Sequence, residues 1–461
     1  MVAIIVHTCL ITAIAVIWKR FSAQAPLRLW IIPGLCLKLL GGVVVGWLFS
    51  KFYGYGGDSW NIFHNARQIS ALATQDFTAY IKLLFFNEYY YIPNLQTPSL
   101  WEQPRLLFIV KITSIINLAT QQNYWFTSFY FSLFAFSGLW QAANTLSRLF
   151  PTTKLSAILA FILFPSVVFW SSGLQKESLA LGIMAWLIHW FLSIFCDNRT
   201  RPGLFWAKVG VLSLVGLYGL WKLKFYYFGG LIPVMVSVLL AYWLYTRIKS
   251  DNKPFQALWL PLVLFVGVLG LLLLMASFMH PKLHLSEFMH VLVLNHNASF
   301  NFSAPDDLIY YYRTDPGFAT LTSTVGNLLY NTPLAFVSGL FRPFIWEANN
   351  PLKLIAGLEN LWMLAFTVYA VIALFFKKRQ LFQGKSLPAK QRFLIIGAVI
   401  YISLLAILLA LASPNLGTLV RYKVGFMSVF LYLIHIPLSY QLNSWLQRFP
   451  FLSKLLTSNQ D

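Results

Sequence analysis

Acidic residues are scarce in this chain. Only 14 of its 461 residues are Asp or Glu, against 34 Lys and Arg, and charged residues make up 10% of the sequence. A soluble globular domain carries roughly 25% charged residues, so the composition excludes an ordinary soluble domain. The formal net charge of +20 would suggest a nucleic-acid partner in a soluble protein. In a membrane protein the same excess is typical of basic loops kept in the cytoplasm, and we predict no nucleic-acid partner.

Cysteines and recognisable catalytic motifs are also few. Cys9, Cys36 and Cys196 are the three cysteines, and each lies in or at the end of an apolar segment. Their spacing matches no metal site, so we interpret them as small core residues. The sequence contains no nucleotide-phosphate loop, no nucleophile elbow and no His/Cys cluster. We therefore predict no metal site. The first apolar segment lacks a charged leader, and we expect a retained helix there rather than a signal peptide.

Long apolar blocks are what the sequence has in abundance. Hydrophobic residues make up 58% of the chain and aromatic residues 17%. The blocks are roughly 17 to 25 residues long, which is the length that crosses a bilayer as a helix. The backbone must satisfy its own hydrogen bonds in hydrocarbon, so each block is predicted to be helical. We predict an all-α polytopic membrane protein with about eleven transmembrane helices. They lie at roughly 1–17, 29–51, 124–147, 155–171, 178–196, 207–222, 229–246, 257–280, 354–376, 393–412 and 424–442.

The connecting loops sort by charge. Six basic clusters fall on one side of the predicted membrane, which the positive-inside rule assigns to the cytoplasm. The N-terminus is then expected outside and the C-terminus inside. The clusters contain Lys19, Arg20, Arg28, Arg148, Lys154, Arg199, Arg201, Lys208, Arg247, Lys249, Lys253, Lys377, Lys378, Arg379, Lys385, Lys390, Arg392, Arg448 and Lys454.

Two long connections fall on the opposite, non-cytoplasmic side. Outer loop one, 52–123, contains weakly amphipathic stretches at 60–86 and 105–121, which we expect to lie on the membrane surface as interfacial helices. Outer loop two, 281–353, contains a short apolar stretch at 331–346. If this stretch crossed the membrane, the basic loops after it would change sides, so we expect it to be interfacial or re-entrant. With no internal repeat, we predict a single transmembrane domain over 1–461.

Asp58 is the first candidate functional residue. It follows a Gly-Gly pair in Tyr55-Gly56-Gly57-Asp58-Ser59-Trp60, just after the second predicted span. The glycines permit a sharp turn, and a helix is expected to begin with Asp58 as its N-cap. One interpretation is that Asp58 is only this cap. The other is a general base at the membrane–water boundary, where partial desolvation raises the basicity of a carboxylate.

Lys176 and Glu177 form the second candidate, in a very short outer loop between two spans. They could be a local ion pair at a helix start, with Glu177 near the positive end of the helix dipole. Alternatively, Lys176 contacts a phosphate and Glu177 acts as a second catalytic carboxylate.

Basic residues on the non-cytoplasmic side form the third candidate. Arg421 and Lys423 lie at the outer start of the last span, and Lys222, Lys224 and Arg342 are also expected on the non-cytoplasmic side. Positive charge on that side runs counter to the positive-inside rule. They could be interfacial side chains that extend toward water. Alternatively they bind an anionic ligand, because an arginine presents a planar fork suited to phosphate oxygens.

Weaker signals come from three further residues. Glu88 and Tyr89 lie in a tyrosine-rich segment that could contact a sugar, since aromatic rings stack on sugar rings. His64 lies two turns into the helix that follows Asp58, and we interpret it either as a surface histidine or as part of the same sugar site. Asp306 and Asp307 are expected to be solvated loop residues.

The layout resembles the GT-C glycosyltransferases, integral-membrane enzymes that use polyprenyl-phosphate sugars. The stretch from Gly57-Asp58 to Ala66-Arg67 resembles the first outer loop of that family, in which the Asp is the catalytic base. Residues 101–123 resemble its second interfacial helix. Residues 164–177 resemble a short outer loop of bacterial members, and Arg421-Tyr422-Lys423 resembles a late basic element before an apolar span. The chain differs from the family in having an extra span before the first loop, and Gly-Asp in place of the usual Asp-Glu pair.

The resemblance implies a sugar transfer on the outer face of a bacterial plasma membrane. A polyprenyl-phosphate sugar is the expected donor, and a lipid, glycan or protein is the acceptor. Asp58, Lys176, Glu177 and Arg421 are then expected to line one outer-facing site. The family leaves room for a divalent cation, which no residue here requires. The alternatives are a lipid-linked glycan transporter or flippase, a glycan polymerase or ligase, and a structural membrane subunit.

Overall fold

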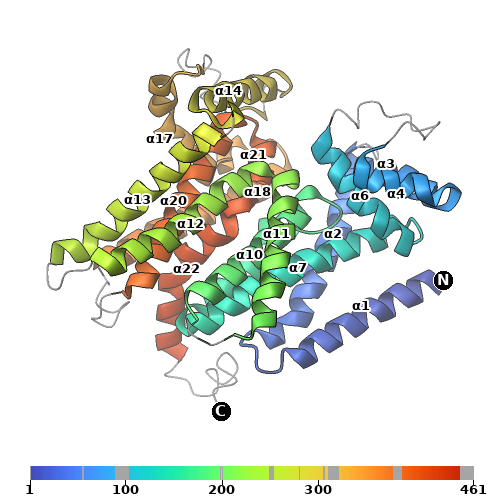
Figure 1. Ribbon diagram of the computed structural model, residues 1–461, viewed down its shortest axis with the longest axis horizontal. Helices are drawn as coiled ribbons and strands as arrows, with labels where there is room; N and C mark the ends of the chain where they lie inside the picture. Colours follow the sequence, from blue (N-terminus) through green and yellow to red (C-terminus); the bar gives the residue numbers. More distant parts are fainter. Residues whose placement is uncertain are drawn as a thin grey trace. The chain divides into compact units, whose positions relative to one another are not determined.

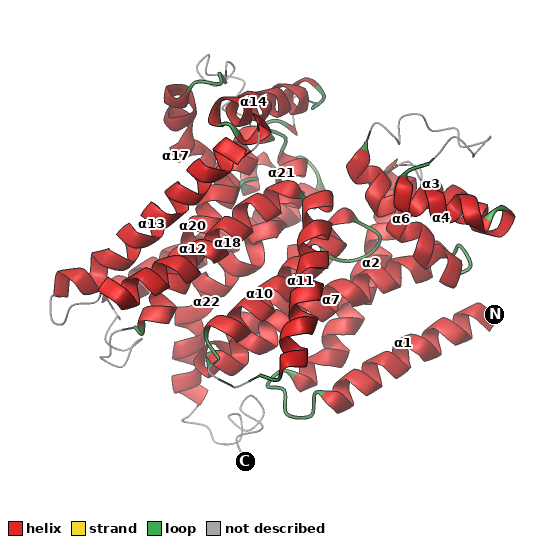
Figure 2. Cartoon of the chain, in the orientation of Figure 1, coloured by secondary structure: helices red, strands yellow, loops and turns green. Residues whose placement is uncertain are grey.

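The described part of the chain is built from α-helices (Figure 2). The computed structural model describes residues 2–53, 57–88, 103–197, 199, 201–248, 254–279, 281–304, 307–309, 321–376 and 387–446. The extended pairing recorded within these ranges is a single bridge between Leu308 and Asn415. The prediction of an all-helical chain is confirmed for the described residues.

Nine helices of the described part are long and apolar enough to cross a membrane. This confirms that the chain has the character of an integral membrane protein. The nine are α1 (Val2–Phe21), α2 (Ile31–Tyr53), α10 (Lys176–Phe195), α11 (Gly203–Leu223), α12 (Phe225–Ile248), α13 (Pro254–Met279), α18 (Pro351–Phe376), α20 (Ala389–Ala412) and α22 (Val424–Leu446).

The other two predicted spans have a different form. Residues 124–147 lie in α7 (Tyr124–Leu149), which begins where the Asn123 side chain accepts hydrogen bonds from the amides of Trp125 and Phe126. Residues 154–170 form an interrupted helix. It consists of α8 (Lys154–Ile158), a π-helical turn (Leu159–Leu163) and α9 (Pro165–Trp170). Pro165 explains the interruption, because a proline has no amide hydrogen to continue the helix.

The chain divides into two compact units. The first contains residues 1–225 and the second residues 226–448. The expectation of one membrane domain over 1–461 remains a prediction, and each unit is described by itself.

Small residues bring the helices of the first unit close together. A Cβ atom on Gly138 of α7 would overlap the backbone of Gly182 in α10, and one on Gly34 of α2 would press against the ring of Phe136. Glycine at such contacts lets transmembrane helices approach closely and pack through van der Waals contact. The core of this unit therefore consists of α2, α7 and α10, with Phe131 and Trp140 buried among them.

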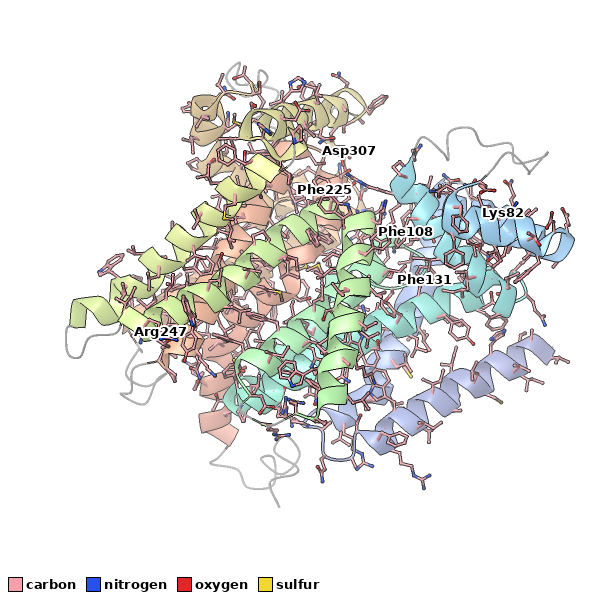
Figure 3. All side chains as sticks on the ribbon, in the orientation of Figure 1. Lys82, Phe108, Phe131, Phe225, Arg247 and Asp307 are labelled. Carbon is pink, nitrogen blue, oxygen red and sulfur yellow. The ribbon has the colours of Figure 1, made fainter. Side chains whose placement is uncertain are left out.

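Three shorter helices follow α2 and pack on one another: α3 (Asp58–Gln75), α4 (Phe77–Phe86) and α6 (Pro104–Ala119) (Figure 1). Lys111 of α6 donates hydrogen bonds to the Leu84 carbonyl at 3.0 Å and to Asn87 Oδ1 at 2.5 Å, which ties the end of α4 to α6. Phe108, labelled in Figure 3, meets Tyr218 of α11 with ring centroids 5.9 Å apart. The expected location of α3, α4 and α6 on a membrane surface remains a prediction.

The second unit combines its long helices with α14 (Leu285–Asn301), α17 (Val325–Phe341) and α21 (Leu416–Tyr422). α17 covers much of the predicted 331–346 stretch and lies so close to α20 that a Cβ on Gly339 would overlap the Ala406 carbonyl. His296 of α14 donates from Nδ1 to the Leu411 carbonyl of α20 at 2.8 Å. Asp307, labelled in Figure 3, pairs with Lys353 at 2.5 Å. The acid expected to be only solvated therefore ties the loop to α18.

Candidate functional site

Asp58 is the first residue of α3, and its side chain is exposed. Gly57 occupies the N-cap, with φ −67° and an extended backbone. The expectation that Asp58 is the N-cap was therefore wrong by one residue. Because the cap residue is a glycine, no side chain caps the first amides of α3. Asp58 lies instead in the first turn, where the helix dipole favours a negative charge.

The start of α3 is fixed against the long helices. Ser59 Oγ lies 2.6 Å from the Tyr124 hydroxyl, and Trp60 Nε1 donates to the Gly46 carbonyl at 3.0 Å. The Trp60 ring stacks on the Tyr124 ring, with centroids 3.8 Å apart and an 8° interplanar angle. Three contacts from two successive residues hold the backbone next to Asp58 in place. A general base must come within hydrogen-bond reach of the hydroxyl it deprotonates, and an exposed carboxylate on a fixed backbone is accessible to such a group.

The exposed face of α3 carries further polar groups at helical spacing. Asn61 lies one turn after Asp58, and His64 lies at the next turn. Asn65 donates from Nδ2 to the Oδ1 of Asn61 at 2.7 Å and to its carbonyl at 2.8 Å. This contact orients the Asn61 amide, so that its two N–H donors remain for another group. Asn61 was missed in the sequence, although its spacing of three from Asp58 was a usable signal.

The segment between α9 and α10 differs from the exposed outer loop that was expected. Residues 171–175 are all buried, and Gly173 has a φ of +73°, which favours glycine. The amide of Gly173 donates to Ser132 Oγ of α7 at 2.8 Å. A Cβ on Gly42, halfway along α2, would meet both this amide and Ser132. The loop therefore packs against the middle of α2.

This loop is held by a buried lysine that was not among the predicted site residues. Lys38 of α2 donates to the carbonyls of Val167 and Val168 at 3.1 and 3.3 Å and also to Ser171 Oγ. These carbonyls belong to the last turn of α9, where they also accept hydrogen bonds from the Ser171 and Ser172 hydroxyls, respectively. Lys38 therefore acts as a C-terminal cap supplied by another helix. A lysine inside an apolar run was the signal, since such residues rarely occur without a role.

Glu177 lies at the start of α10 with its side chain completely buried, and its carboxylate pairs with Lys224 at 2.7 Å. Lys224 directly follows α11, so the pair joins the start of one helix to the end of the next. Lys176 is half-buried, and Lys222 lies over the Tyr218 ring with Nζ 5.6 Å from its centroid. The proposed phosphate contact of Lys224 and the proposed catalytic role of Glu177 remain predictions, and both groups are engaged with each other.

The two candidate segments of the first unit border the same face of α2. Gly46 lies against Tyr124 and accepts from Trp60, beside Asp58. Gly42 lies against Gly173, in the loop that leads to Lys176. Residues four apart lie on one face of a helix and are separated by about 6 Å along its axis. The segment that contains Asp58 and the loop that leads to Lys176 are thus held one helical turn apart along α2.

In the second unit, Lys423 and Arg342 are connected to each other. Lys423 is buried and donates from Nζ to the Arg342 carbonyl at 3.1 Å and to the Asn360 side-chain oxygen. Asn360 donates in turn to the Pro343 carbonyl at 2.7 Å. Arg342 lies 3.4 Å from Glu347. This network fixes the chain after α17 against α18 and α21.

Burial lowers the pKa of Lys423 to about 7, and the Glu359 carboxylate opposes the shift. A buried ammonium is costly, so the neutral amine becomes accessible near physiological pH. Arg421 lies in the last turn of α21 and is half-buried. The roles of Lys423, Arg342 and Arg421 as phosphate contacts remain predictions.

The remaining candidates are less constrained. Glu88 lies 3.9 Å from Lys82, and each of these side chains is a little under half exposed. Tyr89 lies outside the described residues. His64 is exposed beside the rings of Trp60 and Phe63. Within the ranges that the structure covers, no three His, Cys, Asp or Glu residues come together as metal ligands.

Asp58 belongs to the first unit and Arg421 to the second, so their convergence on one site remains a prediction. Comparison of the chain with protein-family models, with curated proteins and with solved structures found no match.

Proposed function

We propose that this protein is a membrane glycosyltransferase. It moves a sugar from a polyprenyl-phosphate donor to a lipid, glycan or protein acceptor on the non-cytoplasmic face. The observation that supports this most is the exposed carboxylate of Asp58 at the fixed start of α3. A donor that diffuses within the bilayer needs no nucleotide site, in keeping with the absence of a nucleotide-phosphate loop from the sequence.

In the proposed reaction, Asp58 accepts the proton of the acceptor hydroxyl. The acceptor oxygen forms a bond to the anomeric carbon of the sugar, and the bond between that carbon and the phosphate oxygen breaks. Polyprenyl phosphate leaves with the bonding electron pair, and the anomeric configuration inverts. Lys176 stabilises the departing anion, aided by the amide groups at the start of α10.

The other cations have different proposed roles. The buried Glu177–Lys224 pair supports a positioning role, since it fixes the start of α10 from which Lys176 extends. Lys222 and Arg421 are less buried than Lys224 and Lys423, and we propose them as further phosphate contacts. Asn61, one turn from Asp58, is proposed to donate a hydrogen bond to a sugar or acceptor hydroxyl.

The proposed topology has eleven spans, with the N-terminus outside and the C-terminus in the cytoplasm. α7 has 26 residues, a length of about 39 Å, which exceeds the roughly 30 Å of hydrocarbon. The interrupted helix over 154–170 is the remaining span. α3, α4, α6 and α17 are proposed to lie at the outer surface.

A lipid-linked glycan transporter is the second candidate, and one observation favours it. Lys38 is buried within α2 beside an interrupted helix, and both features are common near the substrate sites of transporters. A glycan polymerase or ligase would share the donor chemistry with the proposed transferase.

The two candidates differ in whether the sugar–phosphate bond breaks. The purified protein in nanodiscs is incubated with a polyprenyl-phosphate sugar and a mixture of lipid and glycan acceptors, and released polyprenyl phosphate is measured by mass spectrometry. A transferase releases it with time. A transporter moves the intact donor across a liposome bilayer and releases none, an outcome that contradicts the proposal.

A further inference from the structure

Three arginines converge on one carboxylate in the first unit. Asp197 Oδ2 lies 2.7 Å from Arg148 Nη1 and 3.0 Å from Arg201 Nη2, and Asp197 Oδ1 lies 3.6 Å from Arg199 Nε. Arg148 belongs to the last turn of α7, Asp197 follows α10, and Arg201 lies just before α11. The end of α7, the end of α10 and the start of α11 therefore each contribute a charged residue to this cluster.

The charges in this cluster do not balance. Three guanidinium groups meet one carboxylate, which leaves an excess of two positive charges. Each guanidinium carries five N–H donors in a planar fork, far more than one carboxylate can accept. Burial alone would raise the pKa of Asp197, but the hydrogen bonds and charges of Arg148 and Arg199 lower it, so this carboxyl stays ionised. The unmatched donors favour a second anion.

The cluster is also accessible and partly preorganised. The side chain of Asp197 is 9% exposed, whereas Arg148 and Arg201 are 26% and 23% exposed and Arg199 is 69% exposed. The Arg201 guanidinium lies over the Phe205 ring at 4.6 Å, which fixes the plane of its fork. The buried aspartate thus contacts all three arginines, and part of each arginine side chain remains exposed.

An apolar surface begins directly beside the cluster. Leu204 and Trp206, in the first turn of α11, are 81% and 48% exposed, and Val211, Leu214 and Val215 continue the exposed face along the same helix. α11 is one of the helices apolar enough to cross a membrane. A tryptophan at the end of such a helix is typical of the level of the lipid headgroups.

We propose that Arg148, Arg199 and Arg201 bind the phosphate of an anionic phospholipid, whose acyl chains lie along the exposed face of α11. A phosphate with an attached apolar tail matches both halves of the surface, the excess of positive charge and the adjoining apolar helix. Basic pockets between transmembrane helices are suited to such headgroups. This site is separate from Asp58 and does not depend on the proposed transfer reaction.

Native mass spectrometry of the delipidated full-length protein tests the proposal. Phosphatidylglycerol is titrated against phosphatidylcholine, which has a phosphate but no net charge. We expect phosphatidylglycerol to bind more tightly by at least tenfold. A charge near a lipid surface changes binding by about fivefold. Arg148→Gln combined with Arg201→Gln should therefore weaken phosphatidylglycerol binding by about 25-fold.

Two further variants control for misfolding and for the loss of a positive charge elsewhere on the protein. Arg199→Gln alters the most exposed arginine, with the longest contact to Asp197, so it should leave thermal stability unchanged and weaken lipid binding about fivefold. Lys51→Gln removes the same charge from an exposed position on α2, outside both the cluster and α11, and should have little effect.

Three outcomes overturn the proposal. The first is unchanged phosphatidylglycerol binding by the folded Arg199→Gln variant. The second is an equal loss of binding from Lys51→Gln and Arg199→Gln. The third is displacement of phosphatidylglycerol by an equal concentration of inorganic phosphate, which would identify a site for free anions.

Discussion

The ammonium of Lys224 lies 2.7 Å from the carboxylate of Glu177, and the structure leaves these side chains 7% and 0% exposed, respectively. This buried ion pair joins the start of α10 to the end of α11. Removing one partner of such a pair leaves an uncompensated buried charge, at a typical cost of about 3–5 kcal/mol. Replacing both with uncharged residues avoids that cost.

We therefore expect Glu177→Gln and Lys224→Met each to lower the unfolding temperature markedly, and the double variant to recover much of the loss. Thermal unfolding in one detergent at one pH measures all four proteins. A double variant whose loss equals the sum of the two single losses would show that the groups act independently.

Lys38 is expected to matter for stability through the helix end that it caps. Lys38→Met roughly keeps the length of the side chain and removes the donor that links α2 to the Val167 and Val168 carbonyls. These carbonyls keep the Ser171 and Ser172 hydroxyls as donors, so we expect a loss of about 0.5–1.5 kcal/mol. Lys51→Met, at an exposed position of the same helix, is the matched control and should change stability little. Equal unfolding temperatures for the two variants would argue against the capping role.

The pKa of Lys423 predicts how stability depends on pH. An unfolded lysine titrates near 10.5, whereas burial lowers the pKa of Lys423 to about 7 in the folded protein. Between these values the unfolded state binds more protons, so stability should rise with pH from about 7 upward, by at most about 1.4 kcal/mol per unit. Below pH 7 both states are protonated and this contribution is flat.

The measurement compares wild type with Lys423→Met by chemical denaturation at pH 6, 7, 8 and 9. We expect the difference in unfolding free energy to be constant up to about pH 7 and then to grow in favour of wild type. Parallel curves throughout would show that Lys423 has an ordinary pKa.

Asn61 is expected to affect transfer without affecting folding. Its side chain is exposed, so Asn61→Ala should change stability by less than about 0.5 kcal/mol, and lost hydrogen bonds to the substrate should reduce transfer about tenfold. Gln68→Ala, seven residues later on the same exposed face, is the control. Equal transfer rates for both variants would remove Asn61 from the site.

The long helices were predictable because an apolar run long enough to cross a bilayer can be recognised from the sequence alone. The predicted span at 29–51 corresponds to α2 (Ile31–Tyr53), and the one at 424–442 to α22 (Val424–Leu446). The helix start at Asp58 was predicted to within one residue, from the glycines before it.

The contacts between helices were not predictable in the same way. Glu177 pairs with Lys224 because of how α10 and α11 pack, and Lys38 caps α9 because of how α2 and α9 pack. The periodicity of apolar residues along the sequence does not show which helices are neighbours. The burial of residues 171–175 was missed because counting spans assigned this loop to the outer surface. Its small residues, Ser171, Ser172 and Gly173, were a signal for close packing.

Asp58→Asn tests the central claim most directly. Asn keeps the shape of the side chain and removes its basicity, and a general base typically contributes 10²- to 10⁴-fold in rate. Asp76→Asn is the control, because Asp76 caps α4 by accepting from the Ala79 amide and Asn caps equally well. In nanodiscs with a polyprenyl-phosphate sugar, we predict that Asp58→Asn folds, binds the donor and loses nearly all release of polyprenyl phosphate, while Asp76→Asn stays active. Full release by a well-folded Asp58→Asn protein would contradict the account.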